Sequence, residues 1–110
     1  MRRELFKEFN ERYNRLNSSL QLIEDEHANV DSLSDCAPLF NDVMDFFNLC
    51  AEEYFWKDRL GKRIWTSWHD GMNYWYQNVP IIKKMWDEEL DKVGHKAYYL
   101  KEGESFFKDK

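Results

Sequence analysis

The chain has 110 residues, of which 43% are hydrophobic and 17% aromatic, and its formal net charge is −5. This composition excludes a disordered chain and is typical of one globular domain, which we place at residues 1–110. Because no Lys or Arg lies between Arg15 and Lys57, the middle of the chain offers no basic face to a nucleic acid.

Residues 3–27 are predicted to form one long helix. Its apolar positions step alternately by three and four residues, which is the heptad pattern of a helix that packs along one seam. The seam consists of Phe6, Phe9, Tyr13, Leu16, Leu20, Ile23 and His27. Two packings are open. The seam covers the next helix of the same chain, or it forms a homodimer through Phe9, Leu16, Leu20 and Ile23.

Two further helices are predicted at about 36–59 and 62–77, joined by a turn at Gly61. Pro38 suits the first turn of a helix, where its missing N–H is no loss. A glycine after the last periodic residue readily ends a helix, and so short a connection makes the two helices antiparallel neighbours. Gly71 lies inside the later helix, where it indicates either close contact between helix backbones or a local bend.

Pro80 opens a fourth predicted helix, which Gly94 ends. In the aromatic tail that follows we expect residues 98–100 to dock on the bundle. Phe106 and Phe107 adjoin a charged terminus and are expected to be frayed. The sequence therefore predicts an all-α fold, an antiparallel bundle of four main helices with a short C-terminal extension.

The residues that usually carry chemistry form no recognisable catalytic or metal-binding set. Glu24 and His27 make one Glu-x-x-His pair, whereas a di-iron helical bundle requires two such pairs and further carboxylates. Neither Ser67 nor Cys50 has a supported partnership with His69. We therefore expect no catalytic residue, no metal, no cofactor and no enzymatic activity.

The aromatic residues of the middle of the chain allow two interpretations. Apolar stripes at helical spacing usually pack as core, which is the favoured interpretation. The alternative is a ligand pocket lined by Trp65, Trp68 and Trp75.

An acidic surface is predicted on the helix at 36–59, on the side away from its apolar stripe. At 100° per residue, Leu49 and Trp56 fall within the acidic arc. Either another segment of the chain covers them, or they anchor a protein partner that has a basic surface. The candidate partner-binding residues are Asp42, Asp45, Leu49, Glu52, Glu53 and Trp56.

Residues 43–76 resemble a group of uncharacterised bacterial helical domains. In these domains an acidic, aromatic helix ends in a tyrosine-rich turn and a glycine, and a tryptophan-bearing helix with a Tyr-Trp pair near its end follows. The matching residues are Asp45-Phe46-Phe47, Glu53-Tyr54, Gly61, Ile64, Trp65, Trp68 and Tyr74-Trp75. The resemblance implies helical packing and no catalytic residues. Members often carry a membrane anchor ahead of the domain, and the absence of one here weighs against a membrane role.

No segment resembles a signal peptide or approaches the ~18 consecutive apolar residues of a membrane span, so we expect a cytoplasmic protein. The leading functional hypothesis is a protein-interaction or regulatory module of bacterial or mobile-element origin. The alternative is a helical bundle that binds a small ligand in an aromatic pocket.

Overall fold

The computed structural model describes residues 2–109, and over that range it contains helices and no strand, which confirms the all-α class. The first and last residues of the predicted 1–110 domain lie outside the described residues. The elements are α1 (Arg2–Leu22), a π-helical turn η1 (Ile23–His27), α2 (Ala37–Phe55), α3 (Lys57–Leu60), α4 (Lys62–Asn78), α5 (Pro80–Val93) and a 3₁₀ turn η2 (His95–Tyr98).

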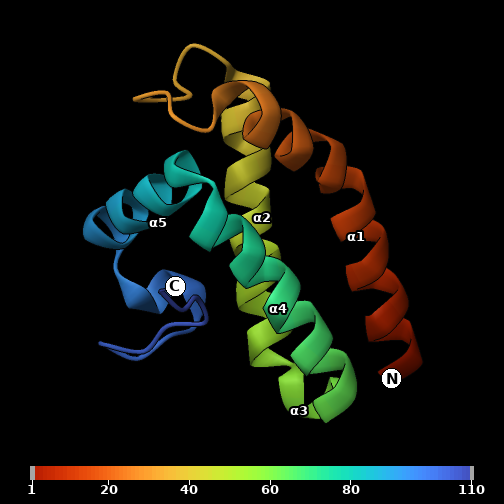
Figure 1. The fold of residues 1–110 in the computed structure, drawn as a ribbon. Helices are drawn as coiled ribbons and strands as arrows, with labels where there is room; N and C mark the ends of the chain where they lie inside the picture. Colours follow the sequence, from red (N-terminus) through yellow and green to blue (C-terminus); the bar gives the residue numbers. More distant parts are fainter. Residues whose placement is uncertain (1, 110) are drawn as a thin grey trace.

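Three long helices, α1, α2 and α4, lie side by side and alternate in direction, whereas α5 turns aside from this row (Figure 1). The predicted helix at 36–59 is divided at Trp56, where the backbone leaves helical geometry before α3 begins. Gly61 then reverses the chain with φ 92°, a conformation that favours glycine. Extended backbone at Val79 redirects the chain into α5, so α5 packs on the bundle at an angle.

The seam of α1 is internal to the chain. Phe9, Leu16, Leu20 and Ile23 are all buried, and α1 makes its most extensive packing with α2. These four side chains therefore pack within the chain and leave little surface for a second copy, and the homodimer through them stays a prediction.

Helix α2 occupies the centre of the molecule and contributes the largest share of the core. Its buried side chains spread over roughly 200° of the helix at 100° per residue, far more than one apolar stripe. They are Leu39, Val43, Phe46, Phe47, Leu49, Cys50, Ala51 and Glu53. Helices α1 and α4 and the C-terminal segment therefore cover α2 from different sides.

The C-terminal segment is part of the core, and the predicted fraying of Phe106 and Phe107 is wrong. Phe106 is fully buried and Phe107 is 5% exposed. The Phe107 ring stacks on Tyr76 with centroids 4.7 Å apart, and both phenylalanines contact the indole of Trp86, at 5.0 and 5.2 Å. This aromatic cluster joins the tail to α4 and α5.

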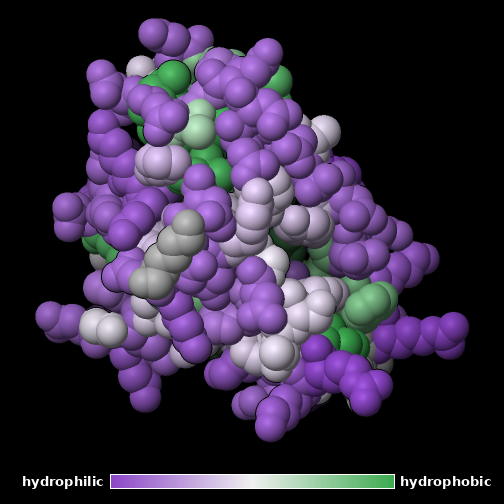
Figure 2. Space-filling model, in the orientation of Figure 1, coloured by the Kyte–Doolittle hydropathy of each residue, from purple (hydrophilic) through white to green (hydrophobic). Residues whose placement is uncertain are grey.

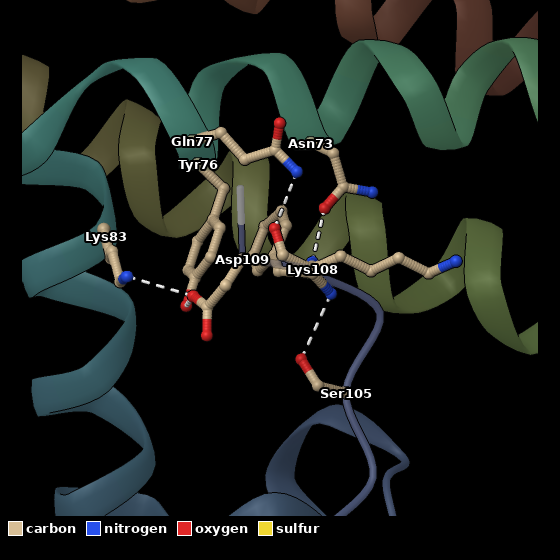
Figure 3. A network of polar contacts seen from close by, with 8 residues as sticks. Asn73, Tyr76, Gln77, Lys83, Ser105, Lys108 and Asp109 are labelled. Atoms are coloured by element: carbon tan, nitrogen blue, oxygen red, sulfur yellow. Dashed lines mark hydrogen bonds and ion pairs between the residues drawn. The ribbon is translucent and has the colours of Figure 1, made fainter.

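Hydrogen bonds hold the backbone of the tail along α4 (Figure 3). The Lys108 N–H donates to Asn73 Oδ1 at 2.5 Å, and Gln77 Nε2 donates to the Lys108 carbonyl at 2.8 Å. Lys83 Nζ lies 3.0 Å from Asp109 Oδ1. An extended segment has no helical partners for its backbone groups, so side chains of α4 supply them.

Truncation of Phe106 should test whether the tail belongs to the core. Phe106→Ala is expected to lower the free energy of unfolding by ~3–5 kcal/mol, because it removes a fully buried ring from a packed cluster. Urea unfolding followed by circular dichroism measures the change. Phe55→Ala, at a phenylalanine that is 60% exposed, is the matched control and should change stability little. Equal effects of the two changes would show that the tail is not docked in solution.

Candidate functional site

A cavity of about 270 Å³ lies between α1, α2 and α4. Each helix contributes residues at helical spacing, so one face of each turns toward the same space. Figure 2 shows this side of the molecule, where paler surface follows α4 among largely hydrophilic side chains. The nine lining residues are Asn10, Tyr13, Asn14, Phe46, Glu53, Ser67, Trp68, Gly71 and Met72.

Two contacts between α1 and α4 lie along the cavity and keep the helices in place. Toward the start of both helices, the Trp68 indole stacks on Phe6 at 5.4 Å. Two turns further along α4, Trp75 Nε1 donates a hydrogen bond of 2.9 Å to the Tyr13 hydroxyl. The cavity lies between these two contacts. The side chains that form them therefore also hold α1 and α4 apart at the cavity.

Gly71 opens the α4 wall of the cavity. A Cβ added at this position would meet nothing within 4 Å. The prediction that Gly71 allows close contact between helix backbones is therefore wrong. The missing side chain instead leaves space, next to Ser67 and Trp68 on the same helix.

The Glu53 carboxyl is the charge-bearing group of the cavity. The residue is only 6% exposed, and its carboxyl forms none of the hydrogen bonds or ion pairs described for residues 2–109. Because no buried side-chain oxygen over that range lacks a hydrogen-bond partner, the carboxyl oxygens reach the accessible surface of the cavity. Burial raises the pKa of Glu53 to about 8, opposed by the positive charge of Arg12 and assisted by the negative charge of Glu52. At neutral pH the group is therefore mostly an uncharged acid with an unused O–H donor and carbonyl acceptor.

Arg12 forms no ion pair with Glu53, because its guanidinium is bound to Glu52. Its guanidinium donates to Glu52 Oε2 at 2.6 Å, and this bond raises the pKa of Arg12. The pair is about one quarter to one third exposed. The basic group nearest to the cavity thus neutralises the neighbouring carboxylate and leaves Glu53 without a counter-ion.

Neutral polar groups of α1 complete the site. Asn10 and Asn14 stand one turn apart on the same face, with Tyr13 beside them. The Tyr13 phenol accepts the bond from Trp75 and keeps its O–H donor for a second partner. Burial raises the pKa of Tyr13, so it remains neutral across the physiological range.

The three tryptophans of the predicted aromatic pocket do not lie around one cavity. Trp68 lines the cavity, whereas Trp65 packs on His69 with ring centroids 4.8 Å apart and contacts Tyr54. Trp75 is buried outside the lining and orients Tyr13. Glu53 was predicted on a partner surface, and Asn10, Asn14 and Tyr13 were not predicted as site residues.

The predicted partner surface is not one continuous exposed patch. Leu49 is 1% exposed and Glu53 is buried in the cavity, so neither is a surface anchor and their assignment is wrong. Asp42 accepts a hydrogen bond of 2.5 Å from Ser19, and Glu52 pairs with Arg12. α1 thus covers most of this face.

Asp45 stays exposed, and Trp56 is half-buried against Phe55 and Arg59.

A different set of aromatic side chains reaches the surface near the end of α2. Phe55 and Tyr99 are each 60% exposed, and their rings lie 5.4 Å apart. Tyr99 has a left-handed backbone, with φ 62°, which is uncommon for a residue with a bulky side chain. Of the three residues expected to dock, Tyr98 and Leu100 are buried and Tyr99 instead faces solvent.

No protein-family model matches the chain, and no curated protein or solved structure matches it. The resemblance of residues 43–76 to uncharacterised bacterial helical domains stays a prediction.

Within the described residues, no three His, Cys, Asp or Glu side chains are grouped as a metal ion would need. Over the same range, none of the helices combines the length and apolar character needed to cross a bilayer.

The burial of Glu53 has a consequence for stability. Because its pKa is raised in the folded state from an ordinary 4.5 to about 8, the folded chain holds this proton more tightly than the unfolded chain. The resulting stabilisation is complete below pH 4.5 and is lost as the pH rises to 8. Relative to Glu53→Gln, the wild type should lose on the order of a few kcal/mol of unfolding free energy between pH 5 and 8.

Urea unfolding at several pH values measures this difference. Asp45→Asn removes a carboxylate from the exposed side of the same helix and should keep the pH dependence of the wild type. Parallel pH profiles for the wild type and Glu53→Gln would show that the Glu53 carboxyl is hydrated.

Proposed function

We propose that this protein binds a small molecule in the cavity between α1, α2 and α4. The cavity supports the proposal because it approaches the size of small-molecule sites, which begin at roughly 300 Å³. By comparison with the roughly 150 Å³ cavity that holds benzene, it has room for a ligand on the order of ten non-hydrogen atoms. Its walls combine the apolar surfaces of Phe46, Trp68 and Met72 with polar groups that all three helices contribute.

The buried Glu53 carboxyl is the observation that carries the proposal. Removing an ionisable group from most of its water costs free energy even where its oxygens reach a cavity, and an apolar residue of similar size would avoid that cost. A domain of this size has only about 5–15 kcal/mol of net stability, so the free-energy cost of burying Glu53 is a considerable part of it. Unfavourable groups of this kind concentrate at functional sites, because a ligand supplies the missing partner.

Filling the cavity from Gly71 tests the proposal. Gly71→Leu extends a side chain from α4 into the space, and Gly71→Ala is the matched control, since its added Cβ meets nothing within 4 Å. Gly71→Ala should stabilise the helix by up to ~1 kcal/mol and leave ligand binding intact. Gly71→Leu should fold and lose binding.

The measurement is a nuclear magnetic resonance screen of fragments that carry positive, neutral and negative groups. Bound fragments should shift the Trp68 indole N–H and the Gly71 amide in the wild type and in Gly71→Ala. The proposal is wrong if no fragment shifts these signals, or if the same fragments bind Gly71→Leu equally well.

A second candidate function is the protein-interaction or regulatory module expected from the sequence, which would act in the cytoplasm. The aromatic surface of Phe55 and Tyr99 favours it, with the half-buried Trp56 beside them. Exposed aromatic side chains supply much of the binding energy at protein interfaces. Tyr99 combines a left-handed backbone with a ring that is 60% exposed.

This second candidate predicts that partner capture depends on the two exposed rings. Phe55→Ala combined with Tyr99→Ala should leave the circular dichroism spectrum unchanged and abolish capture of a partner by the purified protein. Phe40→Ala, at a phenylalanine that is 38% exposed on the same helix, should retain capture. Equal capture by all three proteins would exclude this surface.

A further inference from the structure

The walls of the cavity are electrostatically one-sided. Nine residues line the cavity, all within the described part of the chain. Glu53 is the one acidic residue among them, and none of them is basic. The α4 wall is uncharged, and α1 contributes two amides and a phenol. An anionic ligand would meet no positive group there, whereas a cation would meet a buried carboxylate in a medium where opposite charges attract more strongly than in water.

The remaining groups suit a nitrogen cation. An ammonium group has three N–H donors and no acceptor. Glu53 can accept one of these bonds, and the amide oxygens of Asn10 and Asn14 and the Ser67 hydroxyl can accept others. The Trp68 indole adds an aromatic surface of the kind that attracts cations. A metal ion would require several anionic ligands, and the lining offers one carboxylate.

We infer that the ligand of this cavity is a small organic cation, an amine with an apolar body, whose ammonium group binds the Glu53 carboxylate. This inference rests on the proposed function. The apolar body lies against Phe46, Trp68 and Met72, and the amide groups of α1 complete the solvation of the cation. Binding converts Glu53 from a buried acid to an ion-paired carboxylate, with release of its proton to solvent.

The titratable groups around Glu53 keep their protonation states between pH 6 and 8, so the pH dependence of binding is that of the Glu53 carboxyl. From α1, Arg12 stays positive and Tyr13 stays neutral, and from α2, burial keeps the Cys50 thiol protonated while Glu52 is paired with Arg12. With a pKa of about 8 in the empty site, the ionised fraction of Glu53, and with it the affinity for an amine, should rise about 50-fold from pH 6 to pH 8.

Three probes of similar shape separate charge from shape: 2-phenylethylamine, 2-phenylethanol and phenylacetate. Chemical-shift titration of the full chain with each probe gives affinities for the wild type, Glu53→Gln and Asp45→Asn. The amine should bind the wild type and Asp45→Asn roughly tenfold or more tightly than the alcohol does, because a charge-assisted bond is stronger than a neutral one. Glu53→Gln should remove this advantage and the pH dependence, and phenylacetate should bind weakest.

The outcomes separate the inference from the proposed function. The inference that the ligand is a cation is wrong if the alcohol or phenylacetate binds the cavity as tightly as the amine does. It is also wrong if Glu53→Gln binds the amine as tightly as the wild type does. In either case the cavity remains a binding site. If the amine binds Gly71→Leu unchanged, its site lies elsewhere and the inference is overturned. If neither the probes nor any fragment of the wider screen shifts the Trp68 and Gly71 signals, both proposals fail.

Discussion

The structure depends on the burial of α2 over more than half of its circumference. A helix with one apolar stripe lies on the surface of a core, whereas α2 is covered from three directions by other parts of the chain. The aromatic cluster around Trp86 closes one side and includes the tail residues Phe106 and Phe107. Another side meets α1 and α4, and there the packing leaves a cavity. Phe46 joins the two regions, because its ring contacts Phe107 and also lines the cavity.

The cavity contains two features that reduce stability and that packing alone does not require. Gly71 weakens α4 by about 1 kcal/mol relative to alanine, although its backbone needs no special conformation and nothing crowds it. Glu53 brings an ionisable group into the buried arc of α2, where Arg12 pairs with Glu52 and not with it. Each could be replaced by a residue that stabilises the fold, and both lie on the same cavity. Such a coincidence is expected where a site is kept open for a ligand.

The helices could be predicted from the sequence because each depends on local signals. Periodic apolar residues located all of the long helices, Pro80 marked the start of α5, and Gly61 and Gly94 marked turns with positive φ. The assignment of Leu49 failed because a single-stripe interpretation underestimates the buried arc of a central helix. The docking of Phe106 was missed because an extended tail has no period, and its bonds to α4 come from residues more than thirty positions away.

The cavity could not be predicted, because it depends on the spacing between helices rather than on any one of them. Asn10 and Asn14 lie outside the predicted seam of α1, and Glu53 was assigned to an acidic surface. Gly71 was the one local signal, since a glycine inside a helix requires an explanation, but the two explanations considered were close helix contact and a local bend, not open space. Only the positions of α1 and α4 relative to α2 bring these residues together.

The most direct measurement is a carbon-13 titration of the Glu53 side-chain carboxyl in the folded protein, without ligand. A midpoint near 8 is expected, because the carboxyl is buried in the cavity and has no counter-ion there. A midpoint near 4.5 would show that water or a basic side chain already solvates the group, and would contradict a site that is left incomplete until a cation binds.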